Sequence, residues 1–237
     1  MFWVVKQKKK IGIDMSLFKD VVALWKSDDL LSQAWDESYE MMVLSNQIFN
    51  KAIKYLRENE DFDTIKALKK RDTEINLFQK DVRRKVVTHY SISQDIEDLP
   101  NGLVLLNMVI DVERVGDYTK NILDLALNYP DTMLAEDFSN ELAEIESEVI
   151  SRFEKTIAAI NSQDEEVARS LMSTYKDVVS SSDKIVNGCI SGELSQGSES
   201  KSVALALYAR YLKRIAAHLK NISTILVNPF EAVGYKK

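Results

Sequence analysis

Two acidic side chains four residues apart, Glu113 and Asp117, form the pattern in this sequence with the clearest chemical potential. On a helix this spacing places both carboxylates on one face, one turn apart. Opposite another acidic helix, such a pair would offer oxygen ligands to a hard cation. Asp72 and Asn76 have the same spacing and could supply the second wall. The residues alone favour the simpler interpretation, in which an acidic helix face is exposed to water.

The sequence lacks the usual patterns of catalytic chemistry. Its two histidines, His89 and His218, lie outside any Glu-x-x-His step, which disfavours a di-iron four-helix protein. No Gly-x-Ser-x-Gly, P-loop or Gly-x-Gly-x-x-Gly motif occurs. Cys189 is the only cysteine, so an intrachain disulfide and a thiolate-rich zinc site are excluded. We therefore expect a protein that is not an enzyme.

Composition favours long helices. The 237 residues are 45% hydrophobic and contain only 7 Gly and 3 Pro, too few turn-forming residues for a many-stranded β protein. The net charge of -6 argues against nucleic acid as a partner, because phosphate binding needs a broad basic face. No apolar run approaches the 18 or so residues that span a bilayer. We expect a cytoplasmic protein that is at most peripheral to the inner face of the membrane.

Apolar residues recur at helical spacing in several segments. One amphipathic helix is predicted over about residues 30–58, ended by the polar stretch 57–63. Two further helices are predicted from the apolar stripes Ile75, Phe78, Val82 and Val86, and Leu142, Ile145, Val149, Phe153, Ile157 and Ile160.

Turn and capping residues separate these helices. Pro100, Pro130 and Pro229 each close or interrupt a periodic segment. Ser162 to Glu165 have the capping-box pattern that opens a helix. The stretch 192–202, rich in Ser, Gly and charge, predicts a flexible connector.

An internal repeat gives the domain organisation. Val112 to Ile122 align without a gap with Leu212 to Ile222, at an offset of 212 − 112 = 100, and share an Arg, a Lys, an Asn and an Ile. A weaker echo pairs Asp72 to Asn76 with Asp183 to Asn187. Each half then holds a long helix, a helix with the Asp-x-x-x-Asn step and a helix with the Arg-to-Asn step. This order indicates a duplication.

The predicted fold is all-α, with two tandem three-helix bundles, six long helices and a pseudo-twofold repeat. We expect a leader over 1–28, a first repeat over 29–130 and a second repeat with a short C-terminal tail over 131–237. A single mixed bundle is the alternative. The leader is apolar and then basic, a pattern that suits an anionic membrane surface, although a solvated leader is the simpler interpretation.

The repeated polar residues form a structural signature: Arg114 and Arg214, followed seven residues later by Asn121 and Asn221. In a duplicated fold, such arginines most often form an ion pair or helix-end contact that orients the bundle. The asparagines are candidates for caps or for hydrogen bonds across the bundle. We expect Arg114→Ala to destabilise the protein more than Arg152→Ala.

The stretch 112–122 resembles the signature of the PhoU family, Glu-Arg-Ile-Gly-Asp followed by an Asn four residues later. Here the signature reads Glu113 to Asp117, with Asn121. The second repeat of that family typically reads Glu-Arg-Ile-Ala-Asp-His, and Lys213 to His218 are similar to it. The resemblance extends from about residue 30 to residue 228.

This resemblance implies a regulator of phosphate uptake that acts as an adaptor. Family members are thought to restrain a phosphate ABC transporter and its partner sensor histidine kinase at the cytoplasmic membrane. Relatives of the fold also accompany sodium- or proton-coupled phosphate carriers, so a partner of a single-component carrier is an alternative. A metal-binding or storage protein is another, and a homodimer stays open.

Some family members bind metal clusters, and by position this role would fall to Asp72, Glu113 and Asp117. The second repeat departs from the pattern, because Lys213 and Ala217 replace both acidic residues. An ammonium group repels a cation and a methyl group offers no ligand. We therefore expect at most one divalent ion or one iron or zinc site, in the first repeat.

Overall fold

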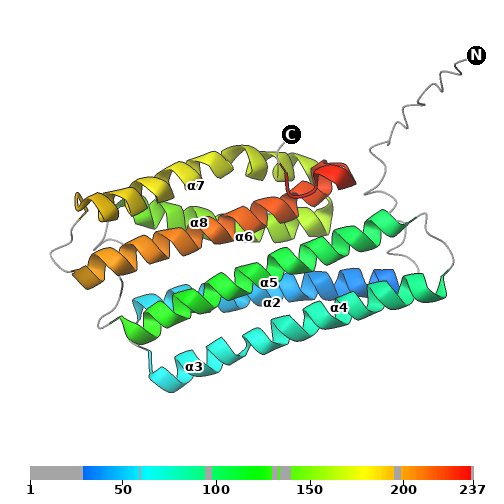
Figure 1. The fold of residues 1–237 in the computed structure, drawn as a ribbon, viewed down its shortest axis with the longest axis horizontal. Coiled ribbons are helices and arrows are strands. Elements are labelled where there is room, and N and C mark those ends of the chain that lie inside the picture. Colours follow the sequence, from blue (N-terminus) through cyan, green and yellow to red (C-terminus); the bar gives the residue numbers. More distant parts are fainter. Residues whose placement is uncertain are drawn as a thin grey trace, which may run out of the picture.

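The computed structural model describes residues 29–58, 60–93, 98–129, 133, 140–194 and 199–235, and their regular structure is helical. The leader 1–28, Pro130 and the expected boundary at 130/131 lie outside these residues. The elements are α2 (Leu30–Arg57), α3 (Phe62–Lys70), α4 (Asp72–Ile92), α5 (Leu99–Asn128), α6 (Asn140–Ser162), α7 (Glu165–Ser191), α8 (Glu199–Val227) and the short 3-10 helix η2 (Phe230–Ala232) (Figure 1).

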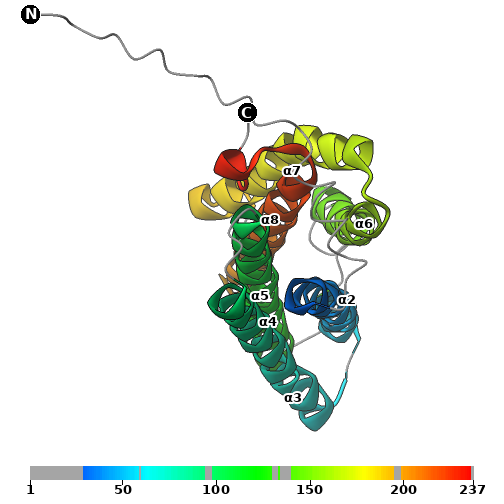
Figure 2. The ribbon, with the colours of Figure 1, turned by 90° about the vertical axis from the view of Figure 1, so that its right-hand side faces the viewer.

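The helices form two three-helix bundles side by side. In the first, α2, α4 and α5 pack against one another, with α3 beside them, and in the second α6, α7 and α8 do so (Figure 2). The bundles meet where α5 packs on α8 and α2 on α6. Arg71, between α3 and α4, keeps helical angles of φ -64° and ψ -14°, so these two elements are one bent helix. The six-helix, two-repeat prediction is therefore confirmed.

No helix in the described ranges contains an apolar stretch long enough to cross a membrane.

Aspartate side chains cap the starts of three helices by accepting backbone N–H groups. Asp29 accepts from Ser32 at 2.8 Å and begins α2. The capping-box prediction placed the start of α7 two residues too early. Ser162 is the last residue of α6, and Asp164 is the cap of α7. Between them Gln163 takes a positive φ of 59°, which turns the chain from one helix into the next.

The starts of α5 and α8 also differ from expectation. Pro100 opens α5 instead of closing a helix, because proline in the first turn loses no intrahelical hydrogen bond. Gly192, with a φ of 82°, ends α7, as a left-handed position favours glycine. The connector predicted over 192–202 is shorter than expected, since residues 199–202 already belong to α8. Its residues 195–198 lie outside the described part.

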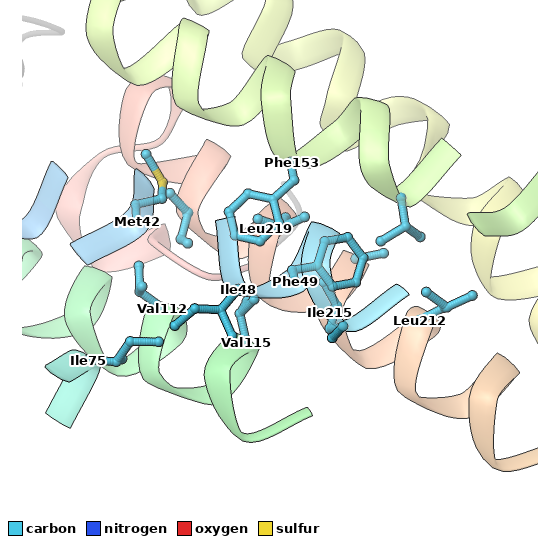
Figure 3. Close-up of a cluster of buried hydrophobic side chains, with 14 of the residues drawn as sticks. Met42, Ile48, Phe49, Ile75, Val112, Val115, Phe153, Leu212, Ile215 and Leu219 are labelled. Carbon is cyan, nitrogen blue, oxygen red and sulfur yellow. The ribbon is translucent and has the colours of Figure 1, made fainter. Parts of the chain in front are cut away.

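One apolar core joins the two bundles. Phe49 of α2 and Phe153 of α6 meet with ring centroids 5.7 Å apart, and both are fully buried. The same core contains side chains from both repeats (Figure 3): Met42, Ile48, Ile75, Val112, Val115, Leu212, Ile215 and Leu219. The two bundles therefore share one hydrophobic core.

Burial confirms the repeat in the third helices. Residues 100 apart in α5 and α8 are buried together: Val104 and Ala204, Leu105 and Leu205, Val109 and Ala209, Val112 and Leu212, Val115 and Ile215, and Ile122 and Ile222.

The second helices have a different register. The caps Asp61 and Asp164 are 164 − 61 = 103 residues apart. The same offset of 103 relates buried positions along the two helices: Ile65 and Ala168, Leu68 and Leu171, Ile75 and Val178, and Val82 and Ile185.

At this offset Asp72 corresponds to Tyr175, and Asp183 corresponds to Lys80. The predicted correspondence between Asp72 and Asp183 is therefore wrong. Burial on the helix face, not the similarity of two polar residues, sets the alignment.

A buried polar cluster links the repeats beside this core. Arg57 of α2 forms an ion pair with Glu146 of α6, and the Tyr208 hydroxyl of α8 donates to the same carboxylate oxygen. Glu146 and Tyr208 are buried. Burial, followed by the neighbouring Glu146 carboxylate, raises the pKa of Tyr208 well above its ordinary value. The phenol therefore stays a donor.

We expect Arg57→Met to lower the free energy of unfolding by about 2 kcal/mol or more, because the buried Glu146 carboxylate loses its cation. Lys54→Met is the matched control on α2, since Lys54 pairs with Glu58 only at the surface. It should change stability by less than about 0.5 kcal/mol. Urea denaturation measures both, and equal losses would contradict a special role for Arg57.

Candidate functional site

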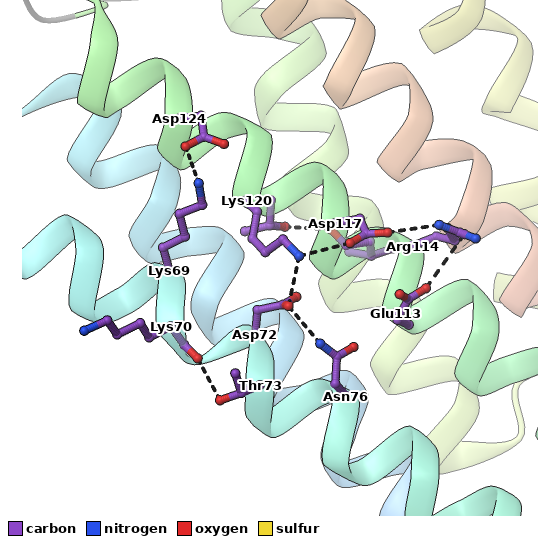
Figure 4. Close-up of polar contacts among 12 residues, drawn as sticks. Lys69, Lys70, Asp72, Thr73, Asn76, Glu113, Arg114, Asp117, Lys120 and Asp124 are labelled. Carbon is purple, nitrogen blue, oxygen red and sulfur yellow. Dashed lines mark hydrogen bonds and ion pairs between the residues drawn. The ribbon is translucent and has the colours of Figure 1, made fainter.

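The start of α4 and the middle of α5 bring the predicted acidic residues near one another (Figure 4). Asp72 is the first residue of α4 and is buried. The helices approach closely at Gly116 of α5. A Cβ atom there would lie 3.2 Å from Ile75 Cδ1 and 3.4 Å from Asp72 Oδ1. The contact with Ile75 would be the tight one, so glycine at this position lets α4 pack closely on the turn of α5 that carries Glu113 and Asp117.

Lys120 lies between the two helices at this point. Its Nζ donates to Asp72 Oδ2 at 2.9 Å and to Asp117 Oδ1 at 3.2 Å. The Asn76 amide also donates to Asp72 Oδ2, at 3.0 Å. Burial alone would lower the pKa of Lys120, but its hydrogen bonds to Asp72 and Asp117 outweigh that effect and raise it. The lysine is therefore a charged bridge from α5 to α4.

Arg114 covers the outer side of the cluster. Its Nη1 donates to Asp117 Oδ2 at 3.0 Å, and its Nε lies 3.7 Å from Glu113 Oε2. Burial and then the Asp117 carboxylate raise the pKa of Glu113. The Arg114 side chain is 55% exposed, and its ion pairs with Glu113 and Asp117 both stay within α5. The expectation that Arg114 is tied into the bundle is therefore wrong.

As they stand, these side chains fit an ammonium group better than a metal ion. In the described part of the chain, no three His, Cys, Asp or Glu side chains form a group that could hold one. Asp72 and Asp117 both turn an oxygen toward Lys120, and Asn76 turns its amide nitrogen, not its oxygen, toward Asp72. The metal site at Asp72, Glu113 and Asp117 stays a prediction.

The matching residues of the second repeat make a different contact, across the interface of the repeats. Asn221 donates to Asp111 Oδ1 of α5 at 3.1 Å, and His218 Nδ1 lies 2.7 Å from the same oxygen. Arg214 donates through Nε to the Tyr118 hydroxyl at 3.1 Å. The polar signature of α8 thus holds α8 against α5, whereas that of α5 faces outward.

Asn121 is placed differently from Asn221. It lines an open hollow of about 290 Å³ with Arg114, Asp117, Tyr118 and Lys120. This hollow lies on the outer side of the acidic cluster.

Lys120 and Arg152 are the important polar residues that the sequence patterns missed. Lys120 has a counterpart in Lys220, 100 residues later, so the sequence repeat contains this lysine but does not indicate its role. Arg152 of α6 is 1% exposed. It donates to the Leu171 carbonyl and to Thr174 Oγ1, both at 2.6 Å, and pairs with Glu148 at 3.0 Å. Burial lowers its pKa, and the Glu148 carboxylate opposes that effect. A buried arginine on an amphipathic helix looks like a surface residue in sequence.

The expected order of stability is therefore reversed. Arg152→Ala should cost about 3 kcal/mol of unfolding free energy, because it removes buried contacts and leaves a cavity between α6 and α7. Arg114→Ala should cost less than about 0.5 kcal/mol, because its ion pairs are solvated. Thermal and urea denaturation of both variants test this order. A larger loss for Arg114→Ala would refute it.

Comparisons with known proteins agree with this architecture. The PhoU domain family matches residues 39–126 and 142–226, one segment in each bundle and together more than half of the chain. A search of curated protein sequences finds no significant match.

Two solved structures are similar in fold. PhoU from Pseudomonas aeruginosa has a TM-score of 0.74 and 20% sequence identity, covering 84% of this chain and 95% of its own. The phosphate transport system regulatory protein PhoU from Streptococcus pneumoniae has a TM-score of 0.72 and 18% identity, covering 83% and 93%. The two matched segments and the shared fold lead to one conclusion: this chain belongs to the PhoU family, with one PhoU domain in each three-helix bundle.

Proposed function

We propose that this protein regulates phosphate uptake as a cytoplasmic adaptor, by binding a cytosolic component of a phosphate transporter. The observation that carries this proposal is the pair of PhoU domains. PhoU-family proteins are regulatory and not enzymatic, and the similar structure from Streptococcus pneumoniae is described as a phosphate transport system regulatory protein. An adaptor needs a stable surface, and a core shared by both bundles supports one.

The outer face of α4 is the surface that we propose for this contact. Leu77 and Val87 are 58% and 63% exposed. They share this helix face with Lys80 and Arg84, both also exposed. Arg84 also pairs with Asp81 at 2.9 Å, so the face keeps one net positive charge. Exposed aliphatic side chains beside such a charge fit a partner surface with an apolar patch and acidic groups around it. The rest of the chain is acidic on balance, so this face differs in sign from the net charge of -6.

The second repeat provides an internal comparison for this face. At the offset of 103, Lys80 and Arg84 of α4 correspond to Asp183 and Asn187 of α7. The fold therefore does not require cations at these positions. The two cations Lys80 and Arg84 are therefore specific to the first repeat.

Co-purification of this chain with the cytosolic components of a phosphate transporter from the same organism tests the proposal. Val87→Glu should weaken capture at least about tenfold, because it puts a negative charge among the cations that face the partner. Ile190→Glu is the matched control, since Ile190 is the counterpart of Val87 on α7 and is 78% exposed. Circular dichroism checks that both variants fold.

Three outcomes would count against the adaptor contact or its surface. Capture of no transporter component would refute the adaptor contact. Equal effects of Val87→Glu and Ile190→Glu would refute the outer face of α4 as its surface. Capture only of a single-component carrier, or only of a sensor kinase, would replace the proposed partner with that protein.

A further inference from the structure

The ammonium group of Lys120 occupies the position between α4 and α5 that a bridging metal ion would take. Asp72 belongs to α4 and Asp117 to α5, and a cation between the two carboxylates would cross-link the helices. That position is taken by the Lys120 ammonium, at 2.9 Å from Asp72 and 3.2 Å from Asp117. The distance to Asp72 is that of a charge-assisted hydrogen bond, and the bond to Asp117 is longer and weaker.

We propose that Lys120 is a built-in cation that takes the place of a metal ion in the first repeat, so that this protein holds α4 against α5 without a metal. This inference goes beyond the proposed function, since an adaptor could act with or without a bound ion. Its basis is a competition for the same carboxylates. A divalent ion placed between Asp72 Oδ2 and Asp117 Oδ1 would have to displace Lys120 from both oxygens.

The local charges oppose such an exchange. Three carboxylates, of Asp72, Glu113 and Asp117, are matched by two cations, of Lys120 and Arg114, which leaves a net charge of -1. A divalent ion would raise this charge to +1 while Lys120 remained nearby. Repulsion between the ion and the ammonium group in this half-buried place would further weaken metal binding.

The other polar groups that could take part in metal binding already have partners. Asn76 donates its amide group to Asp72, so its oxygen is turned away from that carboxylate. The guanidinium of Arg114 holds Asp117 and lies near Glu113. An ion that used the oxygens of Asp72 and Asp117 that Lys120, Asn76 and Arg114 contact would therefore have to break those contacts.

The second repeat cannot supply the site instead. At the offsets of 103 and 100, the counterparts of Asp72, Glu113 and Asp117 are Tyr175, Lys213 and Ala217. The counterpart of Lys120 is Lys220, which donates to the Gly234 carbonyl at 2.8 Å. Lys220 and Tyr175 line a hollow of about 350 Å³, together with Met172, Lys176, Val179 and Ser180. Both repeats thus keep the lysine, but Tyr175 and Ala217 stand in the second repeat where Asp72 and Asp117 stand in the first.

Metal binding by the full-length protein and by Lys120→Met tests the proposal. Each protein is treated with EDTA, desalted and titrated with Mn²⁺ and separately with Zn²⁺ by calorimetry, and its metal content is measured by elemental analysis. The wild type should bind neither ion stoichiometrically, and EDTA should not change its melting temperature. Lys120→Met should bind one ion per chain at least about tenfold more tightly than the wild type, and that ion should raise its melting temperature.

Lys220→Met is the matched control, because it removes the corresponding lysine where Tyr175 and Ala217 replace Asp72 and Asp117, and it should gain no ion. Lys120→Gln is a second variant in case Lys120→Met does not fold alone. Recovery of helical structure on addition of Mn²⁺ or Zn²⁺ would then support the proposal. One tightly bound ion in the wild type, lost in Glu113→Ala or Asp117→Ala, would overturn it. Failure of both Lys120 variants to bind or respond to either ion would also overturn it.

Discussion

The packing of α5 on α8 is the contact on which the rest of the structure depends. Both helices are buried along one face at positions 100 residues apart, and the core on that face continues into both bundles. A three-helix bundle of this size buries a modest apolar area, so the shared face contributes stability that one repeat would lack. The polar contacts of α8 with Asp111 and Tyr118 set the position of one helix on the other.

Charges inside this framework are stable only where another group neutralises or solvates them. Arg57 is placed against Glu146 and Tyr208, and Arg152 against Leu171, Thr174 and Glu148. Lys120 obeys the same requirement at Asp72. Desolvating a charge is costly, and a partner within hydrogen-bond distance offsets that cost. The same rule explains why Arg114, which faces solvent, contributes less to the bundle than its repeated position suggests.

The two repeats share a framework but have diverged at corresponding positions. The third helices keep the Arg-to-Asn signature, yet Asn221 bonds to Asp111 across the interface while Asn121 lines an open hollow. The second helices keep the buried pattern, yet α4 displays cations where α7 has Asp183 and Asn187. A duplicated core constrains the buried side of each helix, and the outer sides are free to specialise. The proposed partner surface and the lysine bridge both belong to the first repeat.

The sequence by itself determined the all-helical class, the duplication and the register of the third helices, because apolar periodicity and the 100-residue repeat are local patterns. It also indicated that Glu113 and Asp117 share a helix face with no equivalent in the second repeat. Only the tertiary structure decided that Lys120 lies between Asp72 and Asp117, that Arg152 is buried, and that Asp72 corresponds to Tyr175. These facts depend on which face of one helix meets another, and on how far a long side chain reaches across the gap. Spacing along a single helix carries neither piece of information.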